Sequence, residues 1–88
     1  MKVKVVVIYR PKSEHARAVE DYLREFFRRT GHKIEAVDID SKEGVQMAGL
    51  YDIMQHPAIL AMSEDGMLVQ SWMGESLPLI DDVMGYMS

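Results

Sequence analysis

The chain has no cysteine in its 88 residues. Without a thiol it forms no disulfide, no thiolate metal site and no cysteine nucleophile. Long apolar runs are also missing, since a run such as residues 5–9 is far shorter than the roughly 20 residues that span a bilayer. Lysine and arginine are in the minority, at 10 against 14 acidic residues, so the formal net charge is −4. Membranes and nucleic acids are therefore not the expected partners.

The rest of the composition is that of a globular protein. Hydrophobic residues make up 48% and charged residues 27%, a balance that excludes a disordered tail. A chain of 88 residues has room for one core, so we expect residues 1–88 to form a single domain. No succession of basic, apolar and small residues opens the chain, and we expect a cytoplasmic protein.

The first part of the chain predicts a strand followed by an amphipathic helix. Residues 2–9 alternate and then become continuously β-branched, as in a central strand buried on both faces. Pro11 ends this strand, and Ser13 is a suitable N-cap for a helix that starts at residue 13 or 14. Gly31 is a natural left-handed C-cap for the same helix. Its apolar positions have helical spacing and are Ala16, Val19, Tyr22, Leu23, Phe26 and Phe27.

A second strand and a short helix follow. Residues 33 to 38 or 39 predict the strand, and Ser41 can begin a helix over residues 42–51. Gly44 and Gly49 each weaken a helix by about 1 kcal/mol relative to alanine. We therefore expect this helix to be the least stable element.

The last part of the chain predicts two strands joined by a hairpin, and then a helix. Residues 58–62 form the third strand, residues 63–66 the turn and residues 67–73 the fourth strand. Ser76 can cap the final helix, with Pro78 tolerated in its first turn. The apolar positions of that helix are Ile80, Val83, Met84 and Met87.

The predicted order is βαβαββα, which belongs to the α/β class. Right-handed helical crossovers make the first two strands parallel, and the hairpin makes the last two antiparallel. The result is a four-stranded mixed sheet with helices on both faces. We expect the first and third helices on one face and the short second helix on the other.

The residues of the second half resemble those of the thioredoxin and glutaredoxin superfamily. Tyr51 stands where a tyrosine ends the second helix in thioredoxins, and Pro57 stands where a proline opens the third strand. Asp65-Gly66 and Gly74 match the turn glycine and the glycine after the fourth strand. The resemblance implies a thioredoxin-like fold of glutaredoxin size over the whole chain. It does not by itself fix an activity, because one fold hosts many functions.

The position of the family's C-x-x-C motif carries no sulfur in this chain. Aligned by spacing, its two cysteine positions are Ser13 and Ala16. Thiol-disulfide exchange needs a thiolate nucleophile and a second, resolving thiol, so no catalytic residue of that kind is present. The buried acidic residue that thioredoxins place on the preceding strand is absent too, since residues 5–8 are valine and isoleucine.

The resemblance implies a cis-proline at Pro57 and a binding groove beside it. In the family, the residue before this proline offers backbone groups to an extended peptide or to glutathione. The predicted groove joins Gln55, His56 and Pro57 to the start of the first helix, and it would bind by backbone pairing.

His15 and His56 should both face this groove, with Ser13 and Glu14 alongside. Three interpretations compete: contacts to a partner, a weak metal site, or a Ser-His nucleophile. A zinc site needs three or four well-placed ligands, and a nucleophile needs an orienting acid and an oxyanion hole. We favour partner contacts and predict no metal.

Arg10 and Lys12 precede the first helix and form a candidate anion site. Helix N-termini attract negative groups, so a carboxylate of glutathione or an acidic side chain of a partner could bind there. A solvated basic loop explains these residues equally well.

Two functions from different classes follow. The first is a redox-inactive thioredoxin-like domain that binds a protein or peptide through the cis-proline groove, without a cofactor. The alternative is a glutathione-dependent, glutaredoxin-like oxidoreductase whose nucleophilic cysteine is replaced by Ser13. Either is compatible with a monomer or a weak homodimer through an exposed edge strand, which Trp72 on the fourth strand would then mark.

Overall fold

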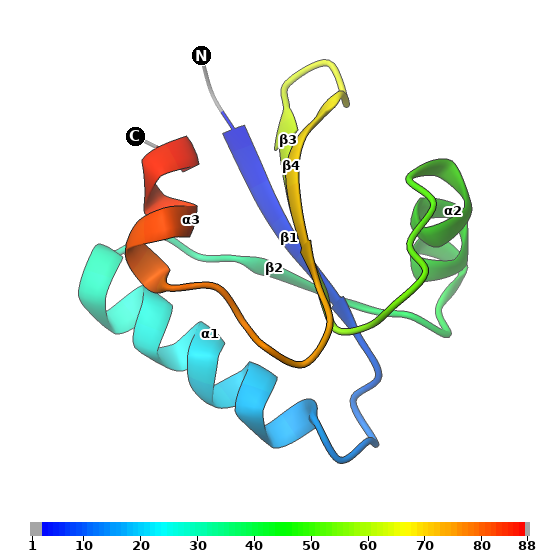
Figure 1. Ribbon diagram of the computed structural model, residues 1–88, viewed down its shortest axis with the longest axis horizontal. Coiled ribbons are helices and arrows are strands. Elements are labelled where there is room, and N and C mark those ends of the chain that lie inside the picture. The colour runs from blue at the N-terminus through cyan, green and yellow to red at the C-terminus, as the bar shows by residue number, and fades with distance from the viewer. Residues whose placement is uncertain (1–2, 88) are drawn as a thin grey trace.

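The computed structural model describes residues 3–87, so Lys2, which the sequence places in the first strand, lies outside the described residues. The observed order is βαβαββα, as predicted (Figure 1). None of the helices within residues 3–87 is long and apolar enough to cross a membrane. The elements are β1 (Val3–Tyr9), α1 (Ala16–Thr30), β2 (Glu35–Asp38), α2 (Lys42–Leu50), β3 (Ala58–Ser63), β4 (Leu68–Met73) and α3 (Ile80–Met87).

The four strands form one mixed sheet in the order β2-β1-β3-β4. β1 runs parallel to β2, with Ile8 opposite Val37, and antiparallel to β3, with Ile8 opposite Ala58. β3 and β4 are antiparallel. The predicted strand directions are confirmed. Because β1 is central, its residues 5–9 are all buried, which explains their continuously apolar sequence.

Side chains alternate between the two faces of the sheet and build two apolar layers. Val7 points to the face where Phe26 of α1 and Val83 of α3 pack. Ile8 points to the opposite face, where Met47 of α2 packs. Figure 1 shows α1 and α3 together on one side of the sheet and α2 on the other. The predicted distribution of helices is confirmed.

The start of α1 differs from the prediction. The helix begins at Ala16, and its N-cap residue His15 makes no side-chain capping hydrogen bond. Ser13 is not the cap, because its Oγ donates a hydrogen bond of 2.6 Å to the carbonyl oxygen of Arg10. That hydroxyl therefore closes a turn before the helix. The predicted end is confirmed, with Gly31 in the left-handed region at φ +75°.

The start of α3 also differs from the prediction. The carbonyl oxygen of Leu79 accepts from the N–H groups of Asp82 and Val83, so the helix begins at Ile80. Ser76 and Pro78 lie in the segment between β4 and α3. The proposed cap at Ser76 is wrong because it lies too far before the first helical turn.

Candidate functional site

Two histidines from distant parts of the chain meet beside the start of α1. The ring centroids of His15 and His56 are 5.5 Å apart, and the rings are inclined at 63° in an edge-to-face arrangement. Such pairs of aromatic rings are favourable at this separation. Both side chains are partly exposed. The contact joins the β1–α1 loop to the segment that precedes β3.

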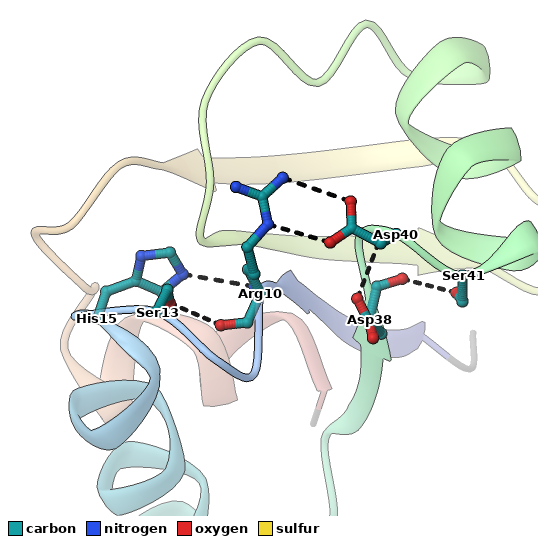
Figure 2. Close-up of polar contacts among 6 residues, drawn as sticks. All are labelled: Arg10, Ser13, His15, Asp38, Asp40 and Ser41. Atoms are coloured by element: carbon teal, nitrogen blue, oxygen red, sulfur yellow. Dashed lines mark hydrogen bonds and ion pairs between the residues drawn. The ribbon is translucent and has the colours of Figure 1, made fainter.

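The β1–α1 loop is held by its own polar groups. The N–H of Arg10 lies 3.5 Å from His15 Nε2, which accepts its hydrogen bond, and Ser13 Oγ donates to the Arg10 carbonyl (Figure 2). The backbone of Arg10 therefore orients both His15 and Ser13.

The guanidinium of Arg10 is already occupied by a carboxylate of the same chain. Its Nε lies 3.1 Å from Oδ2 of Asp40 and its Nη2 lies 3.4 Å from Oδ1 (Figure 2). Asp40 accepts these hydrogen bonds and so raises the pKa of Arg10 above its ordinary value. Of the predicted anion-binding pair, Lys12 is therefore the side chain without an ion pair within residues 3–87. Glu14 is exposed on the same turn.

Sequence reasoning missed the role of Asp40, which joins two loops. The Asp40 N–H donates 2.8 Å to a side-chain oxygen of Asp38, and Ser41 Oγ donates 2.6 Å to the Asp38 carbonyl (Figure 2). The loops after β1 and β2 are thus tied together through Arg10 and Asp40. Both loops follow the carboxyl ends of parallel strands, which is where α/β sheets bring functional groups together. This rule is the signal from which a contact between the two loops could have been predicted.

Pro57 is buried at the end of the segment that joins α2 to β3. The His56-Pro57 peptide bond is cis, and the Pro57 carbonyl accepts a hydrogen bond of 2.9 Å from the N–H of Gly74. The Gln55 side chain lies against Gly74, where an added Cβ would come 3.1 Å from Gln55 Oε1. Met54 next to it is 85% exposed. We call Ser13, His15, Gln55 and His56, above Pro57, the histidine surface.

The geometry of the histidine surface limits its chemistry. The Ser13 hydroxyl donates its hydrogen bond to the Arg10 carbonyl oxygen and not to an imidazole, so no histidine is placed to act as its base. Ala16, at the second predicted cysteine position, is buried. Among residues 3–87, no three histidine or acidic side chains gather closely enough to hold a metal ion. The groups available are two imidazoles, an amide and a hydroxyl, which suit hydrogen bonding and packing.

No protein-family model matches the chain, and no curated protein matches it in sequence. Several solved thioredoxin structures match it in three dimensions. Reduced thioredoxin pre-protein of Schistosoma mansoni superposes with a TM-score of 0.72 at 22% identity, over 98% of this chain and 76% of that one. Oxidised thioredoxin of Plasmodium falciparum gives 0.73 at 17% identity, over 99% and 83%. Mitochondrial thioredoxin 3 of Saccharomyces cerevisiae gives 0.70 at 14% identity, over 98% and 76%.

These similarities define the class of fold. The fold is thioredoxin-like, as the sequence resemblance implies. The particular chain is a thioredoxin-like module that contains no cysteine. At identities of 14–22% the comparisons establish the fold alone.

Proposed function

We propose that this chain is a redox-inactive thioredoxin-like domain that binds an extended segment of a peptide or partner protein at the histidine surface. The observation that carries the proposal is the contact of His15 with His56 in a fold that has no thiol. Two loops are brought together at this point, yet disulfide exchange needs sulfur. Binding without exchange is the function that these groups support best.

The exposed groups suit an extended peptide. Imidazole donates and accepts hydrogen bonds and also offers an apolar ring face. Gln55 adds an amide, and the flexible side chain of Met54 beside it can adapt to different partner side chains. Backbone pairing along residues 55–57 would supply affinity in the manner of an added strand.

The proposal extends to the kind of partner that the chain binds and to the cellular compartment of the chain. A net charge of −4 argues against nucleic acid, and Lys12 remains for an acidic side chain of the partner or for glutathione. Because Asp40 holds Arg10, only one cation of the predicted pair is available, and we propose that glutathione is not a resident cofactor. We place this single domain, residues 1–88, in the cytoplasm.

Replacing His56 by alanine should weaken peptide binding at least about tenfold, because an aromatic contact in the centre of the surface is lost. The free energy of unfolding should change by less than about 1 kcal/mol, since His56 is partly exposed. A random-peptide display library selects the ligand, and fluorescence anisotropy with that peptide gives the affinities.

His32 provides the matched control. It is exposed beyond the C-terminal end of α1, and His32→Ala should bind like the original chain. Equal affinity of His56→Ala and His32→Ala would contradict the proposal, as would a library from which no peptide is retained.

The alternative function is a glutaredoxin-like oxidoreductase in which Ser13 replaces the nucleophilic cysteine. The thioredoxin-like fold favours it. Two local features oppose it. The helix α1 begins only at Ala16, so Ser13 lies outside it. The Ser13 hydroxyl also donates to the Arg10 carbonyl, so a side chain at this position faces a hydrogen-bond acceptor. A thiolate at this position would face an acceptor, so it would not be stabilised as a family nucleophile is.

The substitution Ser13→Cys separates the two functions. We expect a thiol pKa at or above about 8.5, the ordinary value, and no rapid exchange with glutathione disulfide. Alkylation rates measured against pH give this pKa, and Ser76→Cys in the exposed segment before α3 supplies the reference thiol. A pKa well below that of Ser76→Cys, together with rapid exchange, would support the oxidoreductase instead.

A further inference from the structure

The fourth strand leaves one row of backbone groups without a partner strand in the described fold. β4 is the last strand in the order β2-β1-β3-β4 and pairs only with β3. The Gly74 N–H donates to Pro57, and the register places Trp72 opposite Ile59. Because antiparallel residues alternate, Gly74 and Trp72 direct their backbone groups toward β3. The backbone groups of Ser71 and Met73 therefore lie on the side of the free edge, where the Ser71 N–H donates 2.9 Å to the side-chain oxygen Oε1 of Gln70.

This edge lacks the charged and proline residues that usually protect an edge strand against pairing. Natural edge strands carry charges or proline, but the sequence of Leu68–Met73 contains neither. Met73 is 37% exposed. The only irregularity is the register shift between Ala61 and Met62, which places Val69 as an extra residue in β4. The regular part of the free edge thus begins after Val69.

The other edge strand is protected against pairing with itself. β2 has only four residues, Glu-Ala-Val-Asp, and two of them are charged. Short length and charged side chains both protect an edge strand against pairing. β4 has six residues and none of them is charged, so two copies can meet along it without placing carboxylates opposite each other. Charge therefore selects β4 for self-association.

We propose that two copies of this chain associate through antiparallel β4–β4 pairing about a two-fold axis at Trp72. In this register Ser71 of each chain pairs with Met73 of the other, and both residues already point their backbone groups outward. The two pairs can form four backbone hydrogen bonds when each Ser71 N–H exchanges its bond to Gln70 Oε1 for a carbonyl of the other chain. A register centred on Ser71 would instead use the irregular Val69, so the register shift favours Trp72 as the centre.

Trp72 is suited to a position on the axis. Its ring packs edge-to-face on Tyr86 of α3, with centroids 5.6 Å apart, and is itself partly exposed. Gln70 on the same side donates 3.1 Å to the Tyr86 hydroxyl. These contacts fix the ring on one face of the sheet. In the proposed dimer the two Trp72 side chains become directly opposite neighbours, a favourable aromatic pair.

Sedimentation equilibrium of the whole chain tests this proposal. From about 10 µM to 1 mM, the apparent mass should rise from the 10.1 kDa of one chain toward twice that value. The emission of Trp72, the single tryptophan, should change over the same range. Amide exchange at Ser71 and Met73 should slow as the concentration rises.

Substitutions on the two edges separate this contact from general self-association. Ser71→Pro removes an N–H that donates to Gln70 Oε1 rather than to β3, and Ser71→Lys adds an edge charge, so both should abolish the mass increase. Ala36→Lys adds the same charge on β2 and should leave it unchanged. If Ser71→Pro fails to fold, Ser71→Lys alone decides. A constant mass of 10.1 kDa, or association that resists Ser71→Lys, would overturn the proposal.

Discussion

Replacing Gly44 by alanine should lower the free energy of unfolding by about 3 kcal/mol, since overpacking against backbone leaves little room to adjust. A Cβ built at Gly44 lies 2.1 Å from the carbonyl oxygen of Asp38 and 2.9 Å from the Cα of Ile39. Both obstacles are backbone atoms, which cannot rotate away as a side chain does. Accommodating the methyl group therefore requires α2 to move away from the end of β2.

Gly49 in the same helix is the matched control for Gly44. No atom lies within 4 Å of a Cβ built at Gly49, so alanine there should stabilise the protein by about 1 kcal/mol through helix propensity. Urea denaturation followed by circular dichroism measures both variants. Changes of the same sign at the two positions would show that helix propensity, rather than the contact with Asp38, determines the result.

The Gly44 contact also supports the candidate site. The N–H of Gly44 donates 3.0 Å to Ser41 Oγ, which caps α2 as the sequence predicts. Asp38 and Ser41 hold the loop that presents Asp40 to Arg10. Moving α2 would therefore loosen the tie between the two loops. From the sequence, Gly44 is expected only to weaken the helix; the close packing that requires it depends on tertiary structure.

Most helices and strands could be predicted because the patterns that indicate them involve residues close together in the chain. The apolar run in β1, the left-handed position of Gly31 and the capping serine at Ser41 each depend on neighbours in the chain. The two predicted caps at Ser13 and Ser76 are wrong for a common reason. A serine side chain can also donate to a nearby carbonyl or lie outside the helix, and the tertiary structure decides among these roles.

The candidate site was predictable only in part. The resemblance to thioredoxins suggested that His15 and His56 are neighbours, and no spacing rule within the sequence would have done so. The pairing of Arg10 with Asp40 joins residues far apart in the chain and has no periodic signal. For this reason the sequence offers Arg10 either as a candidate anion site or as part of a solvated loop, whereas in the structure it binds a carboxylate of its own chain.

The second large effect is expected at Phe26, where alanine should lower the free energy of unfolding by about 3–5 kcal/mol. Phe26 is 0% exposed and packs in the layer between α1, α3 and the sheet. Phe27 beside it is 57% exposed, so Phe27→Ala should cost less than about 1 kcal/mol. An 88-residue domain has a total stability of only about 4–13 kcal/mol, which makes the contrast easy to measure by urea denaturation.

The contrast between Phe26 and Phe27 also reports how α1 is rotated about its axis. Consecutive helical residues point about 100° apart, so only one of the two can face the sheet. Equal losses for the two alanine variants would mean that α1 turns a different face to the core. Since His15 directly precedes α1, such a rotation would also separate its ring from His56. We therefore expect the residue that fixes α1 on the sheet, Phe26, also to fix the geometry of the histidine surface, so that a folded Phe26→Leu variant binds the selected peptide more weakly than Phe27→Leu does.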